Sequence, residues 1–336
     1  MNNFLVKFDL PQESSLKPGE ELGKVFDLAI LGGGPAGMTA GIYASRKQMN
    51  TVLISLDMGG QVAATMGVEN YMGFQYINGS ELAEKFSTQL KQFPLNLILE
   101  ESISQAAQAP DNLFTVRTNQ GRILSSRSLV IATGKRWRRL GVPGEEAYQG
   151  KGVAYCSTCD APLFKGLAIA VVGGGNSAAG AALDLLALGC QVTLVNVVAG
   201  WQADPVLLER LQGRADLLDR RRVLEVLGDG RKVTGLRLGA VDNAETVLPV
   251  RGVFVEIGMV PNTEPFQGFV ELNEKQEILV DCATRTSRPG VYGAGDCTNV
   301  PDKQIIIAAG EGAKAALAAY RYNLFTRLPL IEGRGI

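Results

Sequence analysis

The 336-residue sequence contains no histidine, and this absence removes several kinds of chemistry at once. It excludes a Ser-His-Asp triad, an imidazole proton shuttle and a zinc site built on histidine. Cysteine is scarce, with five residues. In a chain that we expect to be cytoplasmic, these five do not form a disulfide framework. A close pair among them would therefore indicate redox chemistry.

The sequence also lacks an excess of either charge and lacks a long apolar run. Its 33 Lys+Arg stand against 34 Asp+Glu, so we expect no broad nucleic-acid surface and no nucleic-acid partner. No apolar run reaches the length of a membrane span, and residues 1–24 form a leading tail without a secretory signal. We therefore expect a cytoplasmic protein with no transmembrane segment.

Glycine is abundant, and its first cluster follows a predicted strand over residues 26–31 (FDLAIL). This cluster has the G-x-G-x-x-G spacing, in Gly32, Gly34 and Gly37. A helical pattern over residues 38–46 and a second predicted strand over residues 51–55 come next. The glycines permit a tight turn, close approach of the backbone to a pyrophosphate, and close helix–strand packing. This order of elements predicts dinucleotide binding at a helix N-terminus.

The same pattern returns later in the chain. A predicted strand over residues 167–172 leads into a second glycine-rich loop and helix, and another strand follows over residues 191–195. The spacing is repeated with alanine in the third place, in Gly173, Gly175 and Ala178. Two embedded copies indicate a duplicated architecture. We predict that one copy holds a flavin and the other a second nucleotide.

Two further segments fit a nucleotide-binding fold. Residues 129–136 (LVIATGKR) are predicted to be a strand that ends in a turn of small residues. Residues 290–320 are predicted to be a strand ending at Gly295 and Asp296, then a long alanine-rich helix broken at its start by AAGEG. Such folds bind ligands at the carboxyl ends of their strands, where Asp296 falls. The alternative for Asp296 is a solvated turn.

The sequence YCSTCDAP contains the close cysteine pair, Cys156 and Cys159. The C-x-x-C spacing allows a disulfide and lowers the pKa of one thiol. Zinc would need further ligands, so we expect no metal site. Asp160 is placed to act as a general acid or base in thiol–disulfide exchange. Two buried unreactive cysteines are the alternative. Cys190 and Cys282 are interpreted as small hydrophobic residues, and Cys297 as packing near a cofactor.

The motifs GGGPAG, GGQ, VENY, ATG, C-x-x-C-D, GGGNSA and GD…KQ occur here in the order of the low-molecular-weight thioredoxin reductase family. The chain resembles that family over roughly residues 25–325. CDAPLFKG and AGDCTNVPDKQIIIAAGEGAKA are similar to the reductase portion of the flavoprotein component of alkyl hydroperoxide reductase.

This resemblance implies an α/β fold with two Rossmann-like, three-layer ββα-type nucleotide-binding domains, the second inserted into the first. Residues 25–138 and 264–336 would form the FAD-binding domain, and residues 139–263 the inserted domain that carries the cysteine pair. A homodimer and rotation of the inserted domain are also implied. In the family the second cysteine faces the flavin, so Cys159 would be the flavin-side thiol, Cys156 the exchanging thiol and Asp160 the proton donor.

The resemblance and the loops together give a set of candidate nucleotide-binding residues. For FAD they are Gly32, Gly34, Pro35, Ala36, Gly37, Ser55, Gly60, Gln61, Asn70, Ala132, Thr133, Gly134, Gly295, Asp296, Lys303, Gln304 and Ile305. For the second site they are Gly173, Gly175, Asn176, Ser177, Ala178, Asn196 and Trp201. Trp201 could stack on an adenine or a flavin ring, and ordinary packing is the alternative.

The segment VTLVNVVAGWQAD departs from the family. NADPH-using members carry a His-Arg-Arg run and a further arginine here, and NADH-using relatives carry a glutamate. The aligned residues in this chain are Asn196, Val197, Val198 and Gln202. Each lost charge-assisted hydrogen bond to a 2′-phosphate is worth roughly 1.5–3 kcal/mol. The sequence therefore predicts NADPH binding weakened by several orders of magnitude.

Four functions stay open. Those that are catalytic would have a disulfide-containing protein, such as a thioredoxin, as their partner. The first is a diflavin-linked disulfide oxidoreductase, as in oxygenic photosynthetic prokaryotes, with a second FAD in the inserted domain. The second is a ferredoxin-linked thioredoxin reductase, the third an NAD(P)H-dependent one, and the fourth a non-catalytic flavin-bound redox sensor. The intact second loop favours the first, because a second FAD needs a pyrophosphate cradle.

Overall fold

The computed structural model describes residues 24–65, 67–240 and 245–327. Nearly all of the predicted N-terminal tail lies outside these residues. Contacts divide the chain into two compact units. One comprises residues 24–63, Glu81–Lys135 and 261–327, and the other comprises Ala64–Ser80 and Arg136–Val260. Within the described residues, no helix is long and apolar enough to cross a membrane.

The first unit is built on a parallel sheet with the strand order β19-β8-β2-β3-β4. Its strands are β2 (Leu28–Leu31), β3 (Thr51–Ser55), β4 (Asn96–Leu99), β8 (Leu129–Ile131) and β19 (Val291–Gly293). Every residue of β2, β3, β8 and β19 is buried. Such continuous burial is expected of a parallel sheet that is covered on both faces.

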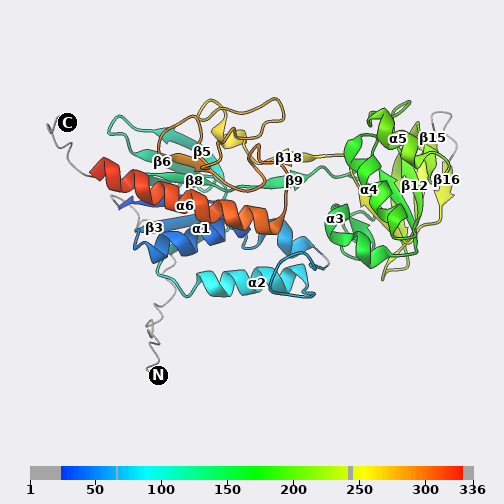
Figure 1. The fold of residues 1–336 in the computed structure, drawn as a ribbon, viewed down its shortest axis with the longest axis horizontal. Helices are drawn as coiled ribbons and strands as arrows, with labels where there is room; N and C mark the ends of the chain where they lie inside the picture. Colours follow the sequence, from blue (N-terminus) through cyan, green and yellow to red (C-terminus); the bar gives the residue numbers. More distant parts are fainter. Residues whose placement is uncertain (1–23, 66, 241–244, 328–336) are drawn as a thin grey trace, which may run out of the picture. The chain divides into compact units, whose positions relative to one another are not determined.

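Alternate side chains of this sheet enter two different cores. Leu31 packs with Phe114 and other residues of a smaller sheet, whose strands lie in the order β1-β7-β6-β5. Leu28 and Ile30 instead pack with residues of α1 and α6, which lie side by side in Figure 1. The elements are β1 (Val25–Phe26), β5 (Ile103–Gln108), β6 (Phe114–Thr118), β7 (Ile123–Ser126), α1 (Pro35–Arg46) and α6 (Ile305–Arg327). The unit therefore has three layers, with helices on one face of the parallel sheet and the smaller sheet on the other. In that sheet β5, β6 and β7 form an antiparallel meander, and β1 pairs in parallel with β7.

The second unit repeats this plan around a parallel sheet with the order β10-β17-β11-β12-β13. Its strands are β10 (Val153–Ala154), β11 (Ala168–Val172), β12 (Gln191–Val195), β13 (Asp216–Leu218) and β17 (Gly252–Val255). Val172 pairs with Val195 on one side and Val255 on the other. The carboxyl ends of β11, β12 and β17 therefore lie at the same edge.

The second unit is also covered on both faces. Ile169 and Val171 pack with residues of α4 (Asn176–Ala187) and α5 (Pro205–Leu211). Ala170 and Val172 pack instead against an antiparallel sheet. That sheet consists of β14 (Arg221–Gly228), β15 (Val233–Ala240) and β16 (Glu245–Leu248). Both units thus have the predicted three-layer Rossmann-like architecture.

Short elements complete the chain. They are η1 (Gly60–Ala64), α2 (Gly79–Leu90), α3 (Ser157–Asp160), η2 (Ala161–Phe164) and η3 (Glu264–Phe266). The chain passes between the units through β9 (Lys135–Trp137) and β18 (Met259–Pro261), which pair with each other. Contacts group Ala64–Ser80 with the second unit, whereas the sequence placed this segment in the FAD-binding domain. The domain limits 25–138, 139–263 and 264–336 stay a prediction.

Several predicted elements need correction. The strand predicted over residues 26–31 is two strands in different sheets, because the chain changes partner at Asp27. Residues 129–136 are likewise divided between β8 and β9. The helix after residue 305 is continuous through AAGEG rather than broken there. The strand before it ends at Gly293, two residues earlier than expected.

Candidate functional site

The first glycine-rich loop lies where the sequence placed it, between β2 and the N-terminus of α1. Pro35 is the first residue of α1 and needs no partner for a backbone N–H there. A Cβ on Gly37 would lie 1.9 Å from the carbonyl oxygen of Gly32, so the third glycine is required for the loop to pack on its own helix. The helix N-terminus is thereby left open to an anionic group.

Backbone and side-chain hydrogen bonds hold this loop in shape. The hydroxyl of Ser55, at the end of β3, accepts a hydrogen bond from the backbone N–H of Gly33 at 2.8 Å. The N–H of Gly59 donates to the Gly33 carbonyl at 2.9 Å, and Asp57 Oδ1 accepts from the N–H of Gly60 at 3.1 Å. Ser55, a predicted FAD residue, therefore supports the loop. Asp57 also supports the loop, and it lies in the segment 55–62 that the resemblance placed along FAD.

The turn of small residues after β8 is fixed by the chain that returns from the second unit. Thr133 Oγ1 donates to the carbonyl of Asn262 at 2.7 Å, and Asn262 Nδ2 donates to the carbonyl of Thr133 at 2.8 Å. The N–H of Asn262 also donates to Gly134 at 3.0 Å. Gln61 Nε2 donates to the carbonyl of Lys135 at 2.5 Å. Asn262 thus fixes Thr133 and Gly134, and Gln61 hydrogen-bonds to the residue that follows them.

The predicted residues near the start of α6 lie among buried charges. Lys135 Nζ is 2.5 Å from Glu277 Oε1, and Lys303 Nζ is 3.7 Å from the same oxygen. Burial would raise the pKa of Glu277, but the hydrogen bonds from Lys135 and Asn273 outweigh it and lower the pKa. Burial also raises the pKa of Asp296 and lowers the pKa of Lys303. Asp296 is thus a partly buried carboxyl and not a solvated turn residue.

Buried contacts also fix the segment that carries Gly295. Its N–H donates to Glu311 Oε2 of α6 at 2.8 Å, and burial raises the pKa of that carboxyl. Cys297 is fully buried and packs in the core between the two sheets. Cys190 is also buried, whereas Cys282 is exposed, which corrects its interpretation as a small packing residue.

These residues of the first unit fit an FAD molecule. A phosphate group needs free N–H donors at the end of a helix, and α1 presents its N-terminus behind a glycine loop with no side-chain cap. An added Cβ on Gly34 would meet no atom within 4 Å, so the loop has open space on its ligand side. The remaining FAD candidates Gln304 and Ile305 lie at the start of α6, and Asn70 lies in the Ala64–Ser80 segment of the other unit.

The second glycine-rich loop has the same local structure as the first. It joins β11 to α4, and α4 starts at Asn176 behind an extended Gly175 with no side-chain cap. Ala178 is fully buried against the sheet. The side chain of Asn176 exchanges hydrogen bonds with Asp204 at 2.9 and 2.7 Å.

Asn196 follows β12, at the position where a nucleotide-binding fold reads the ribose. Its side chain is 4% exposed, and Nδ2 donates to the carbonyl of Gly200 at 2.6 Å. Gln202 is joined to the loop, because its N–H donates to the carbonyl of Gly174 at 2.8 Å. Trp201 is partly buried and packs on the helix-side core. The segment VNVVAGWQ is therefore an ordered turn against the second loop.

Polar residues from a separate segment also border this turn, and the sequence reasoning missed them. Asp219 Oδ2 accepts a hydrogen bond from the N–H of Gly200 at 2.9 Å. The backbone N–H groups of Arg220 and Arg221 donate to carbonyls of this same turn at 3.2 and 2.9 Å. The run DRRR after β13 gave no signal of this proximity, because only the parallel pairing of β12 with β13 brings it here.

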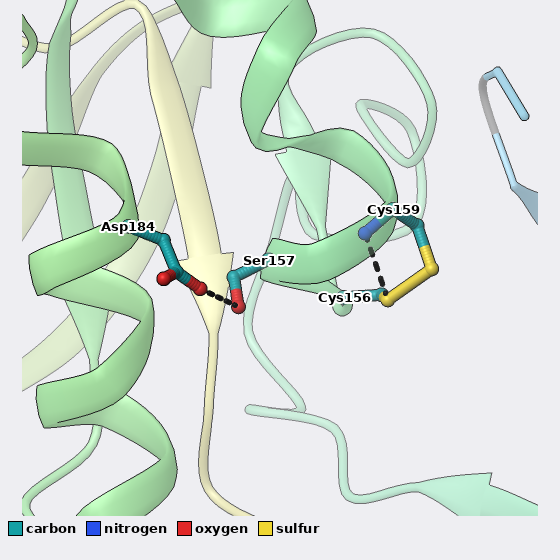
Figure 2. Close-up of a disulfide and its surroundings, with 4 residues drawn as sticks. All are labelled: Cys156, Ser157, Cys159 and Asp184. Atoms are coloured by element: carbon teal, nitrogen blue, oxygen red, sulfur yellow. Dashed lines mark hydrogen bonds between the residues drawn. A yellow bond between two sulfur atoms is a disulfide. The ribbon is translucent and has the colours of Figure 1, made fainter. Parts of the chain in front are cut away.

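The cysteine pair forms a disulfide in the second unit, at the start of α3 (Figure 2). Cys156 caps this short helix, and its Sγ accepts a hydrogen bond from the N–H of Cys159 at 3.2 Å. The two Cα atoms are 5.3 Å apart. Asp160 is the last residue of α3 and is 5% exposed. The structure therefore brings Cys156, Cys159 and Asp160 together on one turn of helix.

A carboxyl that the sequence did not single out lies beside both α3 and α4. Glu256 follows β17, and its Oε2 accepts a hydrogen bond from Ser177 Oγ. It also accepts one from the backbone N–H of Ser157. Burial raises the pKa of Glu256 to about 7, although these two hydrogen bonds act in the opposite direction. No sequence signal could have found Glu256, because it belongs to none of the recognised motifs.

Comparison with known proteins agrees with this geometry. The model of a family described as "Pyridine nucleotide-disulphide oxidoreductase" matches residues 26–316. An alkyl hydroperoxide reductase subunit of Pseudomonas putida is 43% identical over 311 residues, which are 91% of this chain and 60% of that protein. The corresponding subunit of Escherichia coli is 40% identical over 97% of this chain and 64% of its own length. The chain thus spans about three fifths of these curated relatives.

A solved structure covers nearly the same length as this chain. The crystal structure of thioredoxin reductase from Streptococcus pyogenes MGAS5005 aligns with a TM-score of 0.84 and 34% sequence identity. The alignment covers 90% of this chain and 99% of that one. The fold is therefore that of a low-molecular-weight thioredoxin reductase.

Proposed function

This chain belongs to the pyridine nucleotide-disulphide oxidoreductase family, and from that premise we propose that it is an FAD-dependent dithiol/disulfide oxidoreductase. The observation that carries the proposal is the Cys156–Cys159 disulfide at the start of α3, followed at once by the buried Asp160. Bound FAD would supply a carrier of two electrons, held by the first glycine loop. Its substrate would be a disulfide or dithiol of another protein, such as a thioredoxin.

Residues of this chain carry out the thiol chemistry. In the reductive direction, the Cys156–Cys159 disulfide takes up two electrons and two protons and opens to two thiols. The Cys156 thiolate then attacks a disulfide of the partner and forms a mixed disulfide, and one partner sulfur leaves as a thiolate. Cys159 attacks Cys156 to release the second partner sulfur and restore the starting disulfide. Asp160 donates the proton to the leaving thiolate.

The second glycine loop supports a further step of the proposal. We propose that it holds a second dinucleotide without a 2′-phosphate, namely another FAD. The loop keeps an open helix N-terminus, whereas Asn196 and the valines after it offer no cation to a 2′-phosphate. The arginine run after Asp219 is joined to the turn by backbone hydrogen bonds. A homodimer is proposed from the resemblance to thioredoxin reductases.

Counting flavin tests the cofactor part of this proposal. The purified chain is denatured, and the released flavin is measured against the polypeptide concentration. We expect two FAD per chain. A ratio of one overturns the second FAD, and the electron donor is then found by anaerobic titration with NADH, NADPH and reduced ferredoxin. Rapid bleaching by a nicotinamide nucleotide would establish an NAD(P)H-dependent reductase, and bleaching by ferredoxin alone would establish a ferredoxin-linked one.

A cysteine substitution tests the catalytic part. Cys156→Ser should abolish turnover of a thioredoxin disulfide while the flavin stays bound. The matched control is Cys282→Ser, which removes an exposed cysteine of the other unit and should keep full turnover. If the Cys156 variant keeps its turnover, the pair is not catalytic and the chain is a flavin-bound redox sensor instead.

A further inference from the structure

Glu256 stands at the edge of the sheet where the second glycine loop begins. It follows β17 directly, and its backbone N–H donates to the carbonyl of Val172, the last residue of β11, at 2.8 Å. Val172 leads straight into the loop residues 173–178. The Glu256 carboxyl therefore leaves the backbone beside the loop that would hold the diphosphate.

The carboxylate of Glu256 accepts hydrogen bonds from two helices, one behind the second glycine loop and one that carries the redox disulfide. One donor is the hydroxyl of Ser177, the second residue of α4. The other is the backbone N–H of Ser157, the first residue of α3 and the neighbour of Cys156. One carboxylate thus accepts hydrogen bonds both from the nucleotide loop's helix and from the redox helix.

The charged surroundings of Glu256 are unfavourable to a second negative charge. Asp184, on α4, acts on it as a like charge, and Asp184 Oδ2 accepts a hydrogen bond from Ser157 Oγ at 3.3 Å (Figure 2). The titratable groups of α3 are Asp160 and, after reduction of the disulfide, Cys156 and Cys159. Burial and the charge of Asp184 raise the pKa of Glu256 to about 7, which leaves this carboxyl close to its protonation midpoint at neutral pH.

We propose that Glu256 is a positioning residue that links diphosphate binding at the second glycine loop to the reactivity of the Cys156–Cys159 pair. A diphosphate at the N-terminus of α4 brings two negative charges next to this carboxylate, and the complex relieves the repulsion by taking up a proton on Glu256. The inference rests on the proposed second nucleotide site.

Protonation of Glu256 changes the environment of the redox helix. The Ser157 N–H then donates to a neutral carboxyl, and a like charge disappears from beside the thiolates of the reduced pair. Both thiolates become easier to form. Nucleotide binding should therefore speed the reaction of the reduced cysteines with an alkylating agent, and the effect should be reciprocal.

Binding of ADP-ribose at different pH values tests this linkage. Its diphosphate is a diester that does not titrate near neutrality, unlike the terminal phosphate of ADP. The full-length flavoprotein is used, and any flavin above one per chain is removed by dialysis. For the wild-type chain we expect the dissociation constant to rise roughly tenfold from pH 7.5 to pH 8.5. For Glu256→Gln, which is always neutral, the constant should stay the same over this range.

Two further variants serve as controls for this experiment. Glu245→Gln removes the same charge from an exposed side chain of β16 in the same unit, and it should keep the wild-type pH dependence. Ser177→Ala removes one hydrogen bond to the carboxylate, so the pH at which binding weakens should move upward. Equal pH dependence in the wild type and in Glu256→Gln overturns the linkage. No binding of ADP-ribose by any variant at any pH overturns the second nucleotide site itself.

Alkylation of the reduced pair tests the connection to the cysteines. The chain is reduced with a phosphine, desalted without oxygen, and treated with iodoacetamide at pH 7.5 with and without saturating ADP-ribose. We expect ADP-ribose to speed alkylation about threefold in the wild type and to have no effect in Glu256→Gln. An unchanged rate in the wild type, with ADP-ribose bound, would overturn the connection.

Discussion

Two glycines of α6 lead to opposite predictions, although they are only two residues apart. A Cβ added to Gly312 would lie 2.0 Å from the carbonyl oxygen of Ala36 and 2.9 Å from its Cα. An added Cβ on Gly310, which is exposed, would meet no atom within 4 Å. Gly312→Ala should therefore destabilise the first unit, and Gly310→Ala should stabilise it.

The size of each effect follows from the geometry. Both substitutions gain up to about 1 kcal/mol, because alanine is the better helix former. For Gly312→Ala, α6 and α1 must separate by about 1.4 Å before the new methyl group reaches an ordinary 3.4 Å contact. The obstacle is backbone, so no side chain can turn away. Overpacking of this kind costs roughly 1–3 kcal/mol. We expect the two variants to differ by about that amount in unfolding free energy.

Urea unfolding followed by helix circular dichroism measures this difference. Ala36 belongs to the first glycine loop, so Gly312→Ala should also lose flavin more readily during gel filtration, and Gly310→Ala should not. If the Gly312 variant is as stable as the Gly310 variant, the close approach of α6 to α1 is wrong. The role assigned to Gly312 would then be refuted.

Three further predictions concern buried polar groups. The pKa of Glu256 is raised from 4.5 to about 7. The wild type should therefore lose roughly 3 kcal/mol of unfolding free energy as the pH rises from 4.5 to above 7. Urea titrations at several pH values should show this decline in the wild type but not in Glu256→Gln. Lys135→Met leaves Glu277 without its nearest cation and should cost about 3 kcal/mol at pH 7 but less at pH 4. Lys135 helps to hold the pKa of this carboxyl below its usual value, and without that cation burial favours the protonated form, which the variant can adopt at pH 4. Equal costs at both pH values would contradict the ion pair. Asn196→Ala removes the 2.6 Å hydrogen bond to Gly200. It should lower the unfolding free energy measured by calorimetry by about 1–2 kcal/mol and weaken ADP-ribose binding. An unchanged affinity would show that this turn does not contribute to nucleotide binding.

The sequence predicted the local structure of both glycine-rich loops correctly, because their glycines are needed for local reasons. The spacing of Gly32, Gly34 and Gly37 is set by one turn and one helix, so it can be recognised without the rest of the fold. The same holds for Cys156 and Cys159, whose disulfide spans a single helical turn. Such features are encoded within about ten residues.

Prediction from the sequence was wrong or incomplete where residues far apart along the chain determine the structure. The glycines of AAGEG were interpreted as a break in the helix, but Gly312 is there because α1 lies against it. Glu256 gave no signal, because its two donors lie in α3 and α4, far away along the chain. The DRRR run was missed for the same reason, since strand pairing alone brings it to the Asn196 turn.

The paired strands β9 and β18 have a consequence for how such a chain can arise. The N–H of Arg138 donates to the carbonyl of Gly258 at 3.0 Å, and the N–H of Asn262 donates to Gly134 at 3.0 Å. The longer segment of the second unit, Arg136–Val260, therefore begins and ends at neighbouring backbone positions. A protein segment whose ends are adjacent in space can be gained, lost or exchanged without disrupting the domain that carries it, because a short hairpin could close the gap. Recombination could thus replace this segment while the first unit keeps its fold.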